Sequence, residues 1–300
     1  MAVWKRVRQL RTFGERACAA ALGLAVTAGL AGCSAAADAI TAPGAGPASG
    51  GASRGVAARA VTVDGDAARD AVRGVPDALV RAGTARAETA VEMAAGGTRL
   101  AIKGTGRYDF RTRQGELRVV LPGEGSADGR PRPITELFTP GALYMKNRGA
   151  GVPADKWVRI DTGTARDGNL VTGGATDPAA AAELLRAARA VTYVGQAEVA
   201  GVPVSHYRGT THLGDAARGA APPVRGALAA AAKGFATPTV PFDAYLDDAG
   251  RLRKVRHRFS YANEGREVDV ASTTVLHGFG APVAVRLPPK KDIYTGTVQG

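Results

Sequence analysis

The sequence is poor in the side chains from which most active sites are built. It has four histidines and two cysteines in 300 residues, and only 5% of the residues are aromatic. No histidine has a second one at the spacing of a zinc motif. Ser205 and His206 are neighbours on a predicted strand, so their side chains point to opposite faces and cannot pair. His206 and His257 are expected at sheet positions with ordinary hydrogen bonds. These absences indicate a protein that is not an enzyme and that needs no metal or other cofactor.

Long apolar runs are also absent. The longest, residues 17–30, falls short of the roughly 20 residues that a membrane-spanning helix needs. It follows a basic head and ends at Leu30-Ala31-Gly32-Cys33, which is the order of parts in a secretory signal. These four residues resemble the lipobox of bacterial lipoproteins, in which the cysteine receives a diacylglycerol and becomes the new N-terminus. Two acyl chains suffice for stable anchoring, because each buried CH₂ contributes about 0.8 kcal/mol.

Cleavage before Cys33 divides the chain into three parts. Residues 1–32 are the signal peptide, residues 33–65 are a flexible tether rich in Ala, Gly and Pro, and residues 66–300 are a single domain. Removal of the signal also removes Cys18, so the mature chain has no partner for an internal disulfide. The predicted location is extracytoplasmic, on the outer face of the cell membrane, with the membrane bound through the acylated Cys33.

The chain is basic, with a formal net charge of +12. Removal of residues 1–32 takes away five basic residues and one acidic residue, and the remainder stays basic. Such a surplus favours anionic surfaces such as phospholipid head groups or cell-wall polymers. Nucleic acid is not expected as a partner, because no recognition motif for it is present. Lys254, Arg256 and Arg258 alternate along one predicted strand and therefore share one face, which we call the basic face.

Most of the domain shows the two-residue period of strands. Helical patterns cover residues 66–82, broken by Pro76, the segment after Asp177-Pro178, and residues 224–235. In the second of these, the apolar stripe is Leu184, Leu185, Ala188 and Val191. About ten strands are predicted in sequential antiparallel order, with a further short edge segment at 282–291. The pattern predicts an α+β fold.

A long antiparallel sheet with one apolar face has to be covered. The predicted helices are rich in alanine, so they cover it thinly. Two outcomes follow from the residues alone. A gap between helices and sheet would suit an acyl chain, whereas a curled sheet would fill the space with its own Leu, Val and Phe.

The domain resembles the LppX/LprG group of actinobacterial lipoproteins and, more distantly, the LolA-like lipoprotein carriers. Besides the lipobox, the likeness rests on the strand 156–161, on Tyr193-Val194-Gly195 leading to 201–209, and on 244–254. The resemblance implies a curved antiparallel half-barrel of about ten strands, covered on its concave face by about three helices. It also implies an apolar cavity that binds a lipid or lipoglycan for transport in the envelope.

Strand parity and helix stripes suggest which side chains would line that cavity. They are Leu100, Ile102, Leu117, Val119, Leu184, Leu185, Leu228, Phe242 and Phe259. The alternative is a non-catalytic envelope lipoprotein that binds a protein or an anionic cell-wall polymer through the basic face.

Overall fold

The structure is a computed structural model. It describes residues 65–95, 98–121, 133–147, 151–165, 167–171, 176–263 and 266–296. The predicted signal peptide, the lipobox with Cys33 and nearly all of the tether lie outside these residues.

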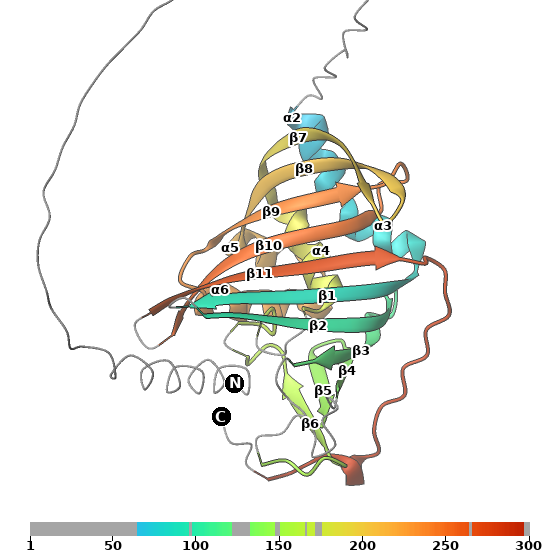
Figure 1. Cartoon of the computed structure of the whole chain (residues 1–300), viewed down its shortest axis with the longest axis vertical. Helices are drawn as coiled ribbons and strands as arrows, with labels where there is room; N and C mark the ends of the chain where they lie inside the picture. Colours follow the sequence, from blue (N-terminus) through green and yellow to red (C-terminus); the bar gives the residue numbers. More distant parts are fainter. Residues whose placement is uncertain are drawn as a thin grey trace, which may run out of the picture.

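Eleven strands form one antiparallel sheet (Figure 1). Its order is β6-β5-β4-β3-β2-β1-β11-β10-β9-β8-β7, so two meanders meet where the first strand pairs with the last. The prediction of about ten antiparallel strands is confirmed, and the strand it missed is β4. The predicted sequential order holds within each meander but not between β6 and β7, which lie at opposite edges of the sheet. The strands are β1 (Thr84–Ala95), β2 (Thr98–Asp109), β3 (Gln114–Val120), β4 (Ile134–Thr139), β5 (Ala142–Lys146), β6 (Trp157–Asp161), β7 (Ala188–Val199), β8 (Val202–His212), β9 (Thr239–Leu246), β10 (Leu252–Asn263) and β11 (Arg266–His277).

The helices lie together on one side of the sheet, which curves around them (Figure 1). The α+β fold class is therefore confirmed, although the described residues hold five α-helices where about three were predicted. The break near Pro76 is present, and α5 is the helix that was not predicted. The helices are α2 (Gly65–Arg73), α3 (Val75–Ala82), α4 (Pro178–Leu184), α5 (Leu213–Gly219) and α6 (Pro222–Gly234), with short 3-10 turns η1 (Leu185–Ala187) and η2 (Lys290–Asp292).

Alternation along the strands decides which side chains meet the helices. On β10, Val255, His257 and Phe259 are buried. The three cations of the basic face occupy the alternate positions and are not buried. The predicted faces of this strand are confirmed. We call the helix-covered face of the sheet concave and the other face convex.

Two local predictions are wrong. The helix after Asp177 ends at Leu184, and Ala188 and Val191 belong to β7. The β7–β8 pairing is irregular between Arg189 and Thr192, and Ala190 has a φ of 47°. This bulge gave the strand a helix-like apolar spacing. The segment 282–291 forms no strand with the described residues, and the chain rejoins the sheet only near β6, where Tyr294 N–H donates to the Trp157 carbonyl over 2.7 Å.

Candidate functional site

All nine predicted cavity residues lie in one buried cluster between the sheet and the helices. The most accessible of them, Leu100, is 9% exposed, and five are fully buried leucines or isoleucine. They come from seven elements spread along the sequence. The fold therefore brings together the residues that strand alternation and helix stripes had indicated. Whether they line a ligand cavity stays a prediction.

The helical cover is built largely from alanine. All seven residues of α4 are buried, and four of them are alanines. Asp177 caps this helix by accepting a hydrogen bond from Ala179 N–H over 2.8 Å, and Pro178 begins it. Small side chains allow α4 to lie deep against the sheet, but they add little apolar surface of their own.

Helix α6 is the outer part of the cover. It packs mainly on α5 and also on α4, and Arg225 and Gly226 face solvent. Just beyond its end, Phe235 stacks on Phe259 of the sheet, with ring centroids 4.9 Å apart. The helix therefore reaches the concave face through a small contact, at one of the predicted cavity residues.

Glycines set the spacing between α6 and the segment that follows β6. A Cβ on Gly168 would lie 2.0 Å from the Ala227 carbonyl oxygen, so only glycine fits there. A Cβ on Gly226 would lie 3.7 Å from the Gly163 Cα, and a Cβ on Gly163 would lie 3.8 Å from the Gly226 Cα. The two backbones are thus in close contact.

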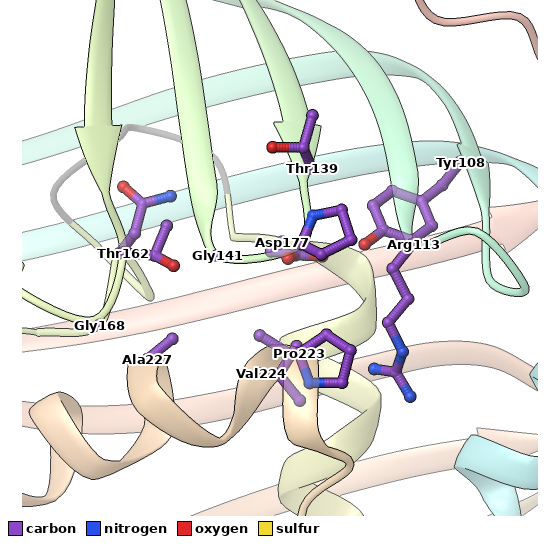
Figure 2. Close-up of a pocket in the computed structure, with 13 residues that line it drawn as sticks. Tyr108, Arg113, Thr139, Gly141, Thr162, Gly168, Asp177, Pro223, Val224 and Ala227 are labelled. Carbon is purple, nitrogen blue, oxygen red and sulfur yellow. The ribbon is translucent and has the colours of Figure 1, made fainter.

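A small polar pocket lies on the helix side, between the first turns of α4 and α6 and the ends of β2 and β4 (Figure 2). Its volume is about 10 Å³, which leaves room for roughly one water molecule. Tyr108, Arg113 and Asp177 all line it, with Arg113 drawn next to Tyr108 (Figure 2). Burial raises the pKa of the Asp177 carboxyl, and the hydrogen bond that it accepts from Ala179 N–H opposes this rise. The pocket is too small for a lipid.

An ion-pair chain runs from this pocket across the helices. Arg113 donates to Glu183 of α4 over 2.9 Å, and Arg186 donates to the other oxygen of the same carboxylate over 2.9 Å. Arg186 also pairs with Asp77 of α3 at 3.0 Å. Glu183 is 1% exposed, so its charge is compensated by two guanidinium groups. This chain holds α3 and α4 to the β2–β3 turn.

Several polar atoms in the core have no hydrogen-bond partner in the described part of the chain. Three lie near the middle of the concave face: Thr89 Oγ1, Thr274 Oγ1 and His257 Nε2. Burial lowers the pKa of His257 to about 3, so its ring is neutral. The expectation of ordinary hydrogen bonds for His257 is therefore wrong at Nε2. Its ring lies between the apolar rings of Phe242 and Phe259, with distances between ring centroids of 6.3 and 6.0 Å.

Glu136 is a second departure from the apolar pattern. It lies opposite Leu117 in the β3–β4 register and so shares the concave face. It is 0% exposed, and neither carboxyl oxygen has a partner within the described residues. Burial raises the pKa of this carboxyl well above its usual value. The sequence analysis missed it, since β4 itself was not predicted.

The basic face is largely paired within the sheet. Arg256 donates to Glu92 over 2.8 Å, and Arg258 donates to Asp243 over 2.7 Å. Lys254 lies over the Tyr245 ring, 5.2 Å from its centroid. Two of the three predicted cations are thus paired with acids of the same sheet, Arg256 with β1 and Arg258 with β9.

Asp243 is the centre of this convex network. Besides Arg258, His206 Nε2 lies 2.9 Å and Arg208 Nε 3.1 Å from its Oδ1. Burial acts to raise its pKa, but the hydrogen bonds from His206, Arg258 and Arg208 outweigh burial and lower the pKa to about 2. These partners come from β8 and β10, the two strands that flank β9, so only the register reveals the cluster.

A hollow of about 600 Å³ lies beside the basic face. Ala94, Ala101 and Ala271 form part of its lining, together with the charged side chains of Glu92, Arg99, Arg256, Arg258 and Asp269. The buried side chains of Met93, Leu100, Phe259 and Val270 line it as well, so the hollow reaches two of the predicted cavity residues, Leu100 and Phe259.

A second group of cations has no ion pair with any described residue. All of its members are exposed on the convex side of β1, β2 and β3, and Arg86 lies directly opposite Arg107. We call this group the β1–β3 cations: Arg86, Arg99, Lys103, Arg107 and Arg118.

None of the helices in the described ranges has the length and apolar character that crossing a membrane requires. The described residues also contain no group of three His, Cys, Asp or Glu side chains that could hold a metal ion.

The chain is similar in fold to solved lipoprotein structures. For LprF from Mycobacterium bovis the TM-score is 0.39 at 14% identity, over 76% of this chain and 99% of that one. For lipoprotein LppX from Mycobacterium tuberculosis the TM-score is 0.42 at 13% identity, over 74% of this chain and 100% of that one. A putative outer membrane lipoprotein-sorting protein domain from Vibrio parahaemolyticus gives 0.31 at 9% identity, over 73% and 95%. No family model and no curated protein sequence matches the chain. The expected resemblance is confirmed as one of fold.

Proposed function

We propose that this protein is a membrane-anchored, extracytoplasmic lipoprotein that binds a lipid or lipoglycan for transport in the envelope. The acyl part of the ligand lies between the concave face and the helices. The observation that carries the proposal is the apolar layer made by an eleven-stranded sheet on one side and alanine-rich helices on the other. Each CH₂ buried in such a layer contributes about 0.8 kcal/mol, so an acyl chain can replace contacts that thin helices make with the sheet.

The ligand enters under α6. This helix is the outer part of the cover, and it meets the sheet through the Phe235–Phe259 contact. Movement of α6 away from the sheet exposes Leu228 of the helix itself and Phe259, on which Phe235 is stacked. The remaining helices stay in place, because α4 is buried on all sides and held by the Arg113–Glu183–Arg186 chain.

A reversible disulfide between α6 and the segment after β6 tests both lipid binding and the route of entry under α6. Gly163→Cys with Gly226→Cys places two thiols where the backbones are in contact, within reach of the roughly 3.5–4.5 Å Cβ separation of a disulfide. The full chain also carries Cys18→Ser and Cys33→Ser, so that no other disulfide and no acyl group of its own interferes. Native mass spectrometry after incubation with envelope lipids measures loading in the oxidised and reduced protein.

The reduced protein is expected to carry lipid and the oxidised protein to carry little. The same polypeptide is its own control, since only the disulfide differs. Equal loading in both states would show that the ligand enters elsewhere. If the mass of the protein shows no bound lipid in either state, nor in the chain without the two new cysteines, the carrier proposal is wrong.

A second candidate function is contact with an anionic envelope polymer through a basic strand surface. The paired basic face does not favour this, but the β1–β3 cations do, because Arg86 lies directly opposite Arg107. Glu116 is opposite Arg107 on its other side, but among the described residues neither arginine forms an ion pair. Like charges directly opposite are unfavourable unless an anion lies between them. Charge reversal at Arg107 and Arg118 is expected to abolish salt-sensitive retention on purified cell-wall polymer. Lys233→Glu on α6 is the control and should be retained like the unaltered chain.

A further inference from the structure

Three buried polar atoms without partners lie close together on the concave face. Thr89 of β1 is directly opposite Thr274 of β11, and they are 3% and 1% exposed. His257 of β10 is opposite Ser272, two residues along β11 from Thr274. Directly opposed residues share a face and have Cβ atoms about 5 Å apart. Thr274 therefore lies opposite Thr89 and diagonally next to His257, at about 7–8 Å, and we call these three residues on consecutive strands the polar cluster.

Such a cluster is costly unless something pairs with it. A buried donor or acceptor without a partner costs about 1–3 kcal/mol, and native proteins contain few of them. Ser272 in the same place is satisfied, because its hydroxyl hydrogen-bonds to Thr176. Thr89 and Thr274 lie in one row of cross-strand partners, and Ser272 and His257 lie in the next. The side chains beside them in these two rows are apolar: Val91, Val255 and Phe242.

The chemistry of the cluster defines what it can bind. Two members are hydroxyl groups that can donate, and the third is an imidazole that burial keeps neutral. No Lys or Arg is paired with or beside these residues in the two rows. The missing partner is therefore an uncharged hydrogen-bond acceptor, which a carboxylate or a phosphate is not.

We propose that Thr89, Thr274 and His257 form the site that binds the carbonyl oxygen of an acyl ester or amide. This inference rests on the proposed function, since it places the linkage of the bound lipid at the middle of the concave face. The protein thus prefers acylated ligands, in which the chain ends in an ester or amide, over ligands of the same length that lack the carbonyl. A plain hydrocarbon or ether leaves the cluster unsatisfied.

The test compares monooleoylglycerol with its ether analogue of the same chain, on the full chain carrying Cys33→Ser. The unaltered site is expected to bind the ester about tenfold more tightly, the effect of one or two hydrogen bonds. In Thr89→Val with Thr274→Val the two ligands are expected to bind equally. Valine has the shape of threonine without the hydroxyl, so the apo variant should melt at the same temperature or higher.

Two controls separate the hydroxyl groups from packing. Thr89→Ser with Thr274→Ser keeps both donors and is expected to keep the ester preference. Thr273→Val removes a hydroxyl from the convex face next to Thr274 and should change nothing. Should the double valine variant misfold, His257→Phe provides an independent reading of the same preference.

The outcomes distinguish the two proposals. Binding of both ligands without an ester preference overturns the carbonyl site and leaves lipid binding intact, and it assigns the cluster to buried water. An ester preference that survives both valines also overturns the site. Failure of the unaltered chain to bind either ligand overturns the site and the proposed function together.

Discussion

At the scale of single residues, Glu136 is the core side chain that is expected to cost the folded state most stability. Its burial without a partner raises its pKa, so the folded protein keeps it protonated while the unfolded chain ionises it above its ordinary pKa. The folded state is thus favoured most below that ordinary value and loses stability as the pH rises. Glu136→Met is expected to raise the free energy of unfolding at pH 7 by about 1–3 kcal/mol.

Urea unfolding at pH 5 and pH 8 measures this effect. The gain from Glu136→Met should be larger at pH 8, because the unaltered chain is then penalised most. Glu116→Met, at a convex position of β3, is the control and should show no comparable dependence on pH. A lower free energy of unfolding for Glu136→Met at both pH 5 and pH 8 would contradict the assignment of a protonated, unpaired carboxyl.

Asp243 shows the opposite linkage. Its pKa of about 2 in the folded state lies below the unfolded value, so its contribution is present above the unfolded pKa and is lost as the pH falls toward 2. Asp243→Asn is expected to lose stability at pH 7 and to show a shallower decline between pH 4 and pH 2. Thermal melts across this range, with the exposed Asp248→Asn as control, measure it. An unchanged acid profile would show that the network contributes nothing.

At the scale of elements, the β7–β8 hairpin carries a correctable strain. Ala200 and Gly201 form its two-residue turn with φ values of 50° and 76°. Positive φ is unfavourable for alanine and well tolerated by asparagine, and Asn-Gly is the preferred pair for such a turn. Ala200→Asn is expected to raise the free energy of unfolding by about 0.5–1 kcal/mol. Ala200→Val should lower it, and equal midpoints of denaturant unfolding for both variants would exclude turn strain.

At the scale of the whole molecule, the predicted anchor determines where the domain works. Cys33→Ser is expected to release the protein from membranes into the soluble extracytoplasmic fraction, because no acyl chain can then be attached at that position. Cys18→Ser, inside the predicted signal, should leave membrane association unchanged. Fractionation with metabolic acyl labelling measures both, and an unlabelled protein that stays in the membrane in both variants would contradict the lipoprotein assignment.

Local periodicity carried most of the element predictions. Period-two patterns predicted most of the strands, and Pro76 predicted the break in the first helical pattern. The prediction missed β4 because Glu136 occupies one of its apolar positions, and α5 because glycines and charges dominate its seven residues. These elements form through tertiary contacts that a short window of sequence does not contain.

The sequence by itself determined the α+β class, the alternation that sorts side chains to the two faces, and the nine apolar residues that share the core. Only the tertiary structure decided that β1 pairs with β11, that Asp243 binds side chains of two flanking strands, and that Thr89, Thr274 and His257 lie on three consecutive strands of the sheet. The physical reason is range. The period of a strand or helix is set by its own backbone, whereas partners across a sheet depend on the register between segments far apart in the chain.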